Sequence, residues 1–302
     1  MPRRPEVEAA LLGLLHGPAE LLPISSSAHA AALPWLLDWR VARWPPGRRK
    51  ELQVALHAGT ALALAADLIP PRQAWGVVAL AAAPAGAAGL VGEEWVESKL
   101  GDPTTLPAGL LAGAAALVCA DHAPGHRHGR MTARDAVWLG LAQALALAPG
   151  VSRTGATLAA ARARGFSRPA ASRLSFAVAG PVLLSATALK GARVAAALNE
   201  TRVAAALEEG RVASTGSNVP PTRSRVGHAL ENACMPPTLE EALDAPAGAT
   251  VALAAAMAAS FVSARAARQL IGLERRRPLW PWAAERVALA VVILVVRYRR
   301  HR

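Results

Sequence analysis

A carboxylate, three hydroxyls and two imidazoles are gathered in one short stretch near the N-terminus. His16 and Glu20 lie four residues apart, so a helix places both on one face. Pro23 ends that helix, and Ser25, Ser26 and Ser27 precede His29. Serine at a helix start caps free backbone N–H groups, and those N–H groups together form a natural binding site for a phosphate. An imidazole is suited to proton transfer near neutral pH, so this stretch predicts chemistry on a phosphate group.

A second polar stretch interrupts an apolar region farther along the chain. Arg153 is its central residue, and a guanidinium binds phosphate through two parallel hydrogen bonds. An arginine in apolar surroundings also needs an anionic partner. The neighbouring residues that we expect to bind substrate supply hydroxyls or permit close backbone approach: Gly150, Ser152, Thr154, Gly155 and Thr157.

The two stretches complement each other chemically, since Glu20 and Arg153 carry opposite charges. We therefore expect Glu20, Ser26, His29 and Arg153 to be catalytic, with Ser25 and Ser27 among the substrate-binding residues. Each residue also has a structural interpretation: the serines as helix caps, His29 as a hydrogen-bonded core histidine, and Glu20 with Arg153 as a buried ion pair. Their joint occurrence at equivalent places in two similar segments favours the functional interpretation.

The rest of the chain predicts a membrane-embedded, all-α helix bundle. Hydrophobic residues make up 53% of the 302 residues, and charged residues only 18%. The net charge of +12 comes from arginines that flank apolar segments, which is typical of membrane proteins and argues against nucleic-acid binding. Six stretches are apolar enough to span a bilayer: 52–68, 74–96, 106–120, 174–194, 249–270 and 282–296.

Two further segments, near 9–37 and 134–163, are apolar at their ends and polar in the middle. Broken helices of this kind occur at membrane depth where they line a cavity. Because the two segments resemble each other, we predict two inverted repeats, about 9–120 and 134–297, within one integral membrane domain of residues 1–302. Residues 193–247 form an expected extramembrane insertion. The N-terminus imitates a signal peptide, but its apolar run is interrupted early, so we expect it to belong to the mature protein.

Several other polar residues are weaker candidates. His57 and Gln143 lie on segments that we expect beside the site. Glu285 and Arg286 stand at the start of the last apolar stretch, and we interpret them as an interfacial ion pair.

ELLPISSSAH (20–29) and ALAPGVSRTGAT (146–157) resemble the two signature segments of the undecaprenyl-diphosphatase, or bacitracin-resistance, family. The resemblance implies hydrolysis of a polyprenyl diphosphate in the plasma membrane, which recycles the carrier lipid of cell-wall synthesis. It also implies roles in catalysis or phosphate binding for Ser26, His29 and Arg153. A divalent cation, Mg²⁺ or Ca²⁺, is expected with Glu20 and His16 as ligands. The family has an acidic or amide residue where this chain has His16.

Other expectations stay open at the level of the sequence. Either Ser26 attacks the terminal phosphorus or His29 activates a water molecule. The chief rival function is a polyprenyl-phosphate transporter or flippase, for which repeats and broken helices are equally expected. A lipid phosphatase with a histidine nucleophile and a membrane scaffold are weaker rivals. A homodimer is a further expectation.

Overall fold

The computed structural model describes residues 4–70, 72–100, 102–185, 187–189, 191, 246–270, 277–300 and 302. Within these ranges the regular elements are helices, accompanied by one isolated bridge between Arg127 and Phe166, so the predicted all-α class is confirmed. The insertion expected at 193–247 lies almost entirely outside the described residues.

Four helical segments are long and apolar enough to cross a membrane: Arg72–Gly92, Pro103–His122, Arg168–Leu189 and Gly248–Leu270. They include most of α4 (Trp75–Leu100), α5 (Leu106–His122) and α11 (Pro246–Ala266). The other two predicted spans are helical as well, within α3 (Pro46–Leu68) and α13 (Trp280–Arg300). Both of these helices contain charged residues, which makes them less apolar than the four candidates.

Both predicted broken helices are present. The first consists of α1 (Pro5–Leu21) and α2 (Ser26–Leu36), separated by a short turn that contains Pro23. The second consists of α6 (Ala133–Leu145) and α7 (Arg153–Ala163).

The residue before the second half of each broken helix has an unusual backbone conformation. Ser25 precedes α2 with a φ of 72°, and Ser152 precedes α7 with a φ of 65°. Non-glycine residues rarely adopt positive φ, and such strain is concentrated at functional sites. The two breaks therefore share a local geometry, while the inverted relation of the two halves stays a prediction.

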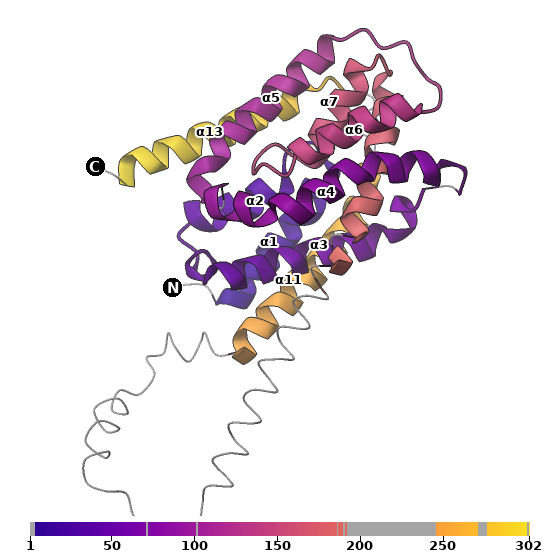
Figure 1. Ribbon diagram of the computed structural model, residues 1–302. Coiled ribbons are helices and arrows are strands. Elements are labelled where there is room, and N and C mark those ends of the chain that lie inside the picture. Colours follow the sequence, from indigo (N-terminus) through magenta and orange to yellow (C-terminus); the bar gives the residue numbers. More distant parts are fainter. Residues whose placement is uncertain are drawn as a thin grey trace, which may run out of the picture.

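Helices that are distant in sequence pack side by side (Figure 1). α11 lies against both α1 and α3, and α13 runs along α5. α4 packs on α6, and α7 contacts both α5 and α6. The two broken helices are thus held in one bundle by flanking helices.

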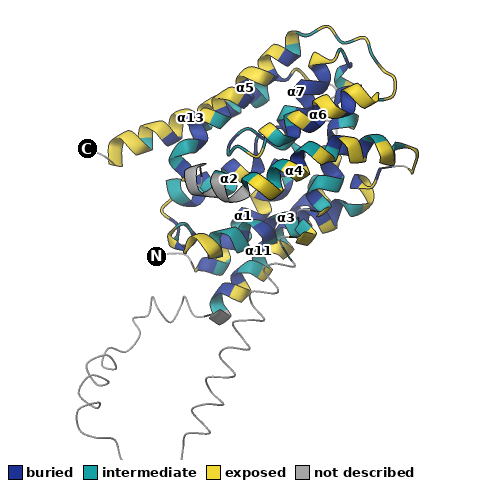
Figure 2. Ribbon diagram, viewed as in Figure 1, coloured by how far each residue is buried: buried dark blue, intermediate teal, exposed yellow. Residues whose placement is uncertain are grey.

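Large apolar side chains cover outward faces of the bundle. Leu62, Val91 and Val262 are each more than 60% exposed. Figure 2 shows exposed residues along α5 and α13, and Leu111 and Val291 are among the exposed large apolar residues of these helices. Patches of this kind are rare on soluble monomers, whereas in a bilayer these side chains contact lipid tails.

Glycines permit the close approach of α11 to its two neighbours. A Cβ at Gly13 or Gly17 of α1 would overlap backbone atoms of α11, and a Cβ at Gly59 of α3 would do the same. Small residues at such crossings are typical of helix packing in membranes.

The variant Gly13→Ala should therefore destabilise the bundle by about 1–3 kcal/mol, since α1 and α11 must separate to admit the methyl group. Gly76→Ala is the matched control, because nothing lies within 4 Å of a Cβ at that position in α4. Thermal unfolding in detergent should show a lowered midpoint for the first variant only. Equal midpoints for both variants would contradict the packing described here.

Candidate active site

Glu20 is the centre of a polar cluster that joins the two helix breaks. It lies near the end of α1, and its side chain is only 8% exposed. Arg153, the first residue of α7, donates from Nη2 to Glu20 Oε1, while the Ser26 hydroxyl of α2 donates to Glu20 Oε2. The predicted meeting of a carboxylate from one segment with a guanidinium from the other is confirmed.

In this cluster the buried charge of Glu20 is paired, and Arg153 keeps a hydrogen-bond donor that can bind an anion. A buried carboxylate is costly unless it is paired and hydrogen-bonded, and Glu20 has both kinds of partner. Arg153 Nε, by contrast, has no hydrogen-bond partner among the described residues, although it is buried. Charge-assisted bonds from a guanidinium to phosphate are strong and directional, so Arg153 is chemically suited to receive one.

A cavity of about 1660 Å³ adjoins this cluster. Its polar part contains seven of the predicted site residues: Glu20, Ser25, Ser26, Ser27, Ser152, Arg153 and Thr154. His57 and Gln143 also line it, as expected from their sequence positions. Much of the remaining wall consists of apolar side chains of α4 together with Pro181, Val182, Leu183, Leu184 and Leu189.

Three predicted substrate-binding residues lie outside the cavity lining, and the structure assigns them packing contacts. Gly150, with a φ of 92°, lies against Leu106 and Leu110 of α5. Gly155 lies against the guanidinium of Arg286. Thr157 is fully buried and bonds through its hydroxyl to Ser175 Oγ at 2.6 Å.

His29 also lies outside the cavity lining, and its ring is held on both sides. Its Nδ1 is 2.8 Å from the carbonyl oxygen of Ser25, and its Nε2 is 2.8 Å from Glu285 Oε1. The expected ion pair of Glu285 with Arg286 is therefore wrong. Neighbours in a helix point in different directions, and Glu285 faces His29 while Arg286 faces the bundle interior.

Arg286 ties the two helix breaks together, a role that the sequence interpretation missed. Its side chain is fully buried, and its Nε donates to the carbonyl oxygen of Pro23 at 2.8 Å. Its Nη1 donates to the carbonyl oxygen of Val151 at 3.0 Å. A charged residue within an apolar helix indicates a functional site or a polar partner in the bundle interior. The position of Arg286 in the apolar sequence of α13 is such a signal.

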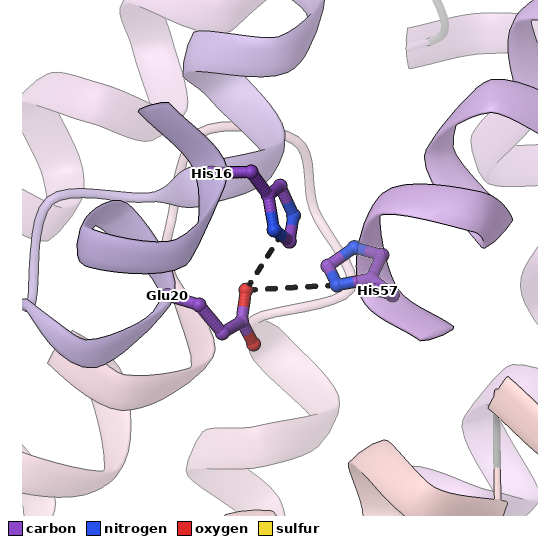
Figure 3. Close-up of side chains that lie close together, drawn as sticks. All are labelled: His16, Glu20 and His57. Carbon is purple, nitrogen blue, oxygen red and sulfur yellow. Dashed lines mark ion pairs between the residues drawn. The ribbon is translucent and has the colours of Figure 1, made fainter. Parts of the chain in front are cut away.

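Two imidazoles lie beside the same Glu20 oxygen that accepts from Ser26 (Figure 3). His16 Nε2 lies 3.9 Å from Glu20 Oε2, and His57 Nδ1 lies 3.6 Å from the same oxygen. One ligand atom from each of the three residues lies within 4.8 Å of the other two. The expected pair of metal ligands, His16 and Glu20, thus has His57 as a third neighbour.

The helical bundle and its cavity define a class of protein: a membrane-embedded protein with a buried polar site beside an apolar chamber. The family model described as bacitracin resistance protein BacA matches residues 9–219, so the chain belongs to this family.

Curated relatives with the name undecaprenyl-diphosphatase match much of the chain. Those of Geobacter sulfurreducens and Thermomicrobium roseum are 37% identical over 207 residues and 36% identical over 214 residues. That of Elusimicrobium minutum is 34% identical over 203 residues. Each match covers 61% of this chain and 75% of the relative. The resemblance drawn from the two signature segments is confirmed.

Replacing Arg286 by lysine should lower the thermal unfolding midpoint in detergent, because one ammonium group cannot reach both loop carbonyls. Loss of a buried, charge-assisted hydrogen bond costs about 1.5–3 kcal/mol. Arg265→Lys is the control, since Arg265 is exposed on α11. If the two variants unfold at the same temperature, Arg286 does not hold the breaks together.

Proposed function

We propose that this chain hydrolyses undecaprenyl diphosphate to undecaprenyl monophosphate and inorganic phosphate. The observation that carries the proposal is the contact of Arg153 and Ser26 with Glu20 on the wall of a membrane-embedded cavity. The name of the curated relatives supports the same reaction. Phosphate release from undecaprenyl diphosphate by the purified protein tests it, because a transporter alone releases none.

The cavity suits a substrate with a charged head and a long apolar tail. Arg153 and the serines Ser25–Ser27 lie at its polar part, where they would bind the diphosphate. The alanine-rich face of α4 and the apolar side chains from Pro181 to Leu184 would contact the prenyl chain. An apolar tail in this chamber gains the free energy of hydrophobic burial, while the anion stays with its donors.

In this proposal Arg153 orients the diphosphate and stabilises the charge that develops during phosphoryl transfer. Phosphoryl transfer depends mainly on positioning and electrostatic stabilisation, which a fixed guanidinium provides. Glu20 holds Arg153 in place before substrate binds. The Nε of Arg153, which lacks a partner among the described residues, supplies a further donor for a phosphate oxygen.

Ser26 is the proposed nucleophile. Its oxygen attacks the terminal phosphorus, its proton passes to Glu20, and the bond from that phosphorus to the bridging oxygen breaks. Undecaprenyl monophosphate leaves with the electron pair, and water then releases inorganic phosphate from the phosphoserine. The Ser26–Glu20 hydrogen bond makes the carboxylate the proton acceptor in reach.

His29 has a positioning role in this scheme. The sequence assigned proton transfer to its imidazole, but both ring nitrogens are engaged, with the carbonyl of Ser25 and with Glu285. Through Ser25 the ring holds the strained residue that immediately precedes Ser26. His29 would therefore affect catalysis by keeping the serine loop in its reactive conformation.

A divalent cation near Glu20 is also part of the proposal, as the family resemblance implies. The side chains present fit the expected Mg²⁺ or Ca²⁺ poorly, since both ions prefer oxygen ligands and two of the three nearby donors are imidazole nitrogens. We place the protein in the plasma membrane, where the carrier lipid is recycled, and retain a homodimer as a proposal.

Arg153→Ala should reduce phosphate release by at least about 10²–10³-fold, the usual cost of removing a donor that stabilises transition-state charge. Arg173→Ala is the control, because Arg173 is exposed and lies outside the cavity lining. Both variants should elute as folded protein in detergent. Retained turnover in Arg153→Ala would remove the central element of the proposal.

Ser26→Ala should reduce turnover by about 10³-fold or more, because loss of a nucleophile removes the covalent route. Ser27→Ala should have a smaller effect, since the hydroxyl of Ser27 contacts Ser25 and not Glu20. With substrate labelled in its terminal phosphate, acid-quenched wild-type protein should carry label as phosphoserine, and the Ser26 variant should carry none. Full activity in Ser26→Ala would favour direct attack by water.

A further inference from the structure

We propose that His16, Glu20 and His57 form a binding site for a divalent transition-metal ion of the zinc class. The site lies at the polar end of the cavity described above, and its function as a cofactor site rests on the proposed phosphatase activity. The binding itself can be measured independently. Figure 3 shows the three side chains converging from α1 and α3.

The first observation is an unpartnered nitrogen in the bundle interior. His16 is only 3% exposed, and its Nε2 has no hydrogen-bond partner among the described residues. That nitrogen faces Glu20 Oε2 at 3.9 Å, which is too long for a hydrogen bond. Buried polar atoms are nearly always satisfied, so an isolated one aimed at a carboxylate calls for a bound partner.

The second observation is a hydrogen-bonded chain that orients the same ring. His16 Nδ1 lies 3.1 Å from Thr60 Oγ1, which lies 2.8 Å from Ser260 Oγ. Ser260 Oγ in turn lies 2.8 Å from the carbonyl oxygen of Leu56, which can only accept. The one arrangement that places a proton in each of these three contacts runs from the Nδ1–H of His16 to Thr60, from Thr60 to Ser260, and from Ser260 to the carbonyl of Leu56.

This direction of the chain decides what His16 presents to Glu20. With its proton on Nδ1, the neutral ring has a lone pair on Nε2, and that lone pair points at a carboxylate oxygen. Two electron-rich atoms facing each other are stabilised by a cation between them. A histidine that binds a metal through one ring nitrogen characteristically donates the N–H of its other ring nitrogen to a nearby acceptor.

The distances suit a small ion. Ligand atoms about 2.1 Å from a tetrahedral metal lie roughly 3.4 Å from one another. The separations from Glu20 Oε2 are 3.6 Å to His57 Nδ1 and 3.9 Å to His16 Nε2. Closing these two separations requires movements of a few tenths of an ångström, and the ligand nitrogens of the two imidazoles lie within 4.8 Å of each other.

The donor set selects the class of metal. Two imidazoles and one carboxylate are typical ligands of zinc and of divalent iron, whereas magnesium and calcium prefer oxygen. Glu20 and His57 also line the cavity, so an ion there would keep an open position toward the diphosphate. A divalent ion beside Arg153 and Glu20 leaves a formal charge of +2, which complements an anionic substrate.

Cobalt(II) is the probe for the experiment, because its visible absorption bands report coordination directly. Full-length protein in detergent, stripped with chelator, should bind one Co²⁺ with these bands, and Zn²⁺ should displace it in the presence of excess Mg²⁺. His16→Gln and His57→Gln should each weaken Zn²⁺ binding by more than about 100-fold. Thr60→Val removes the hydroxyl that accepts from His16 Nδ1 and should weaken binding by about 10–100-fold.

His122→Gln is the matched control, since His122 is exposed and bonds to a backbone carbonyl of α5. It should bind Co²⁺ like the wild type. Absence of Co²⁺ bands in the wild type, or unchanged bands in both ligand variants, would overturn the metal site. In that case, phosphate release supported by Mg²⁺ alone would leave the phosphatase proposal valid. Conversely, Co²⁺ binding without phosphate release under any metal would overturn the phosphatase proposal but not the metal site.

Discussion

The backbone polar groups exposed by two broken helices must be satisfied inside a membrane, and the rest of this structure depends on that constraint. Lipid offers no hydrogen bonds, so a helix can be interrupted only where protein groups take over. Arg286 does so for both breaks at once, with one donor on the carbonyl of Pro23 and another on that of Val151. These two carbonyls offset part of the cost of burying its charge.

The same constraint creates the polar site. Breaking α1 from α2 places the Ser26 hydroxyl against Glu20, and breaking α6 from α7 places Arg153 at a helix start where it reaches the same carboxylate. Buried ion pairs contribute little net stability, because desolvation offsets attraction. The position of this pair on a cavity wall therefore fits its proposed role in binding and chemistry better than a role in stability.

Close helix packing makes the imidazole cluster possible. His16 and His57 belong to different helices, and α11 lies against both of them through contacts that glycines permit. Ser260 of α11 then completes the hydrogen-bonded chain that orients His16. Packing, ring orientation and the proposed choice of metal are thus linked through three helices.

The sequence alone determined the helical class, the two breaks and the pairing of Glu20 with Arg153, because hydrophobic length and isolated charges in apolar segments are local signals. Tertiary structure decided the rest. His29 took Glu285 as its partner across 256 positions, Arg286 turned to the loops, and His57 came within reach of Glu20. These residues become partners because the folded bundle brings them close together. Their spacing along the chain does not predict this proximity. The sequence predicts Gly150, Gly155 and Thr157 as substrate-binding residues, and the fold places them outside the cavity lining, because composition cannot distinguish the cavity side of a loop from its packed side.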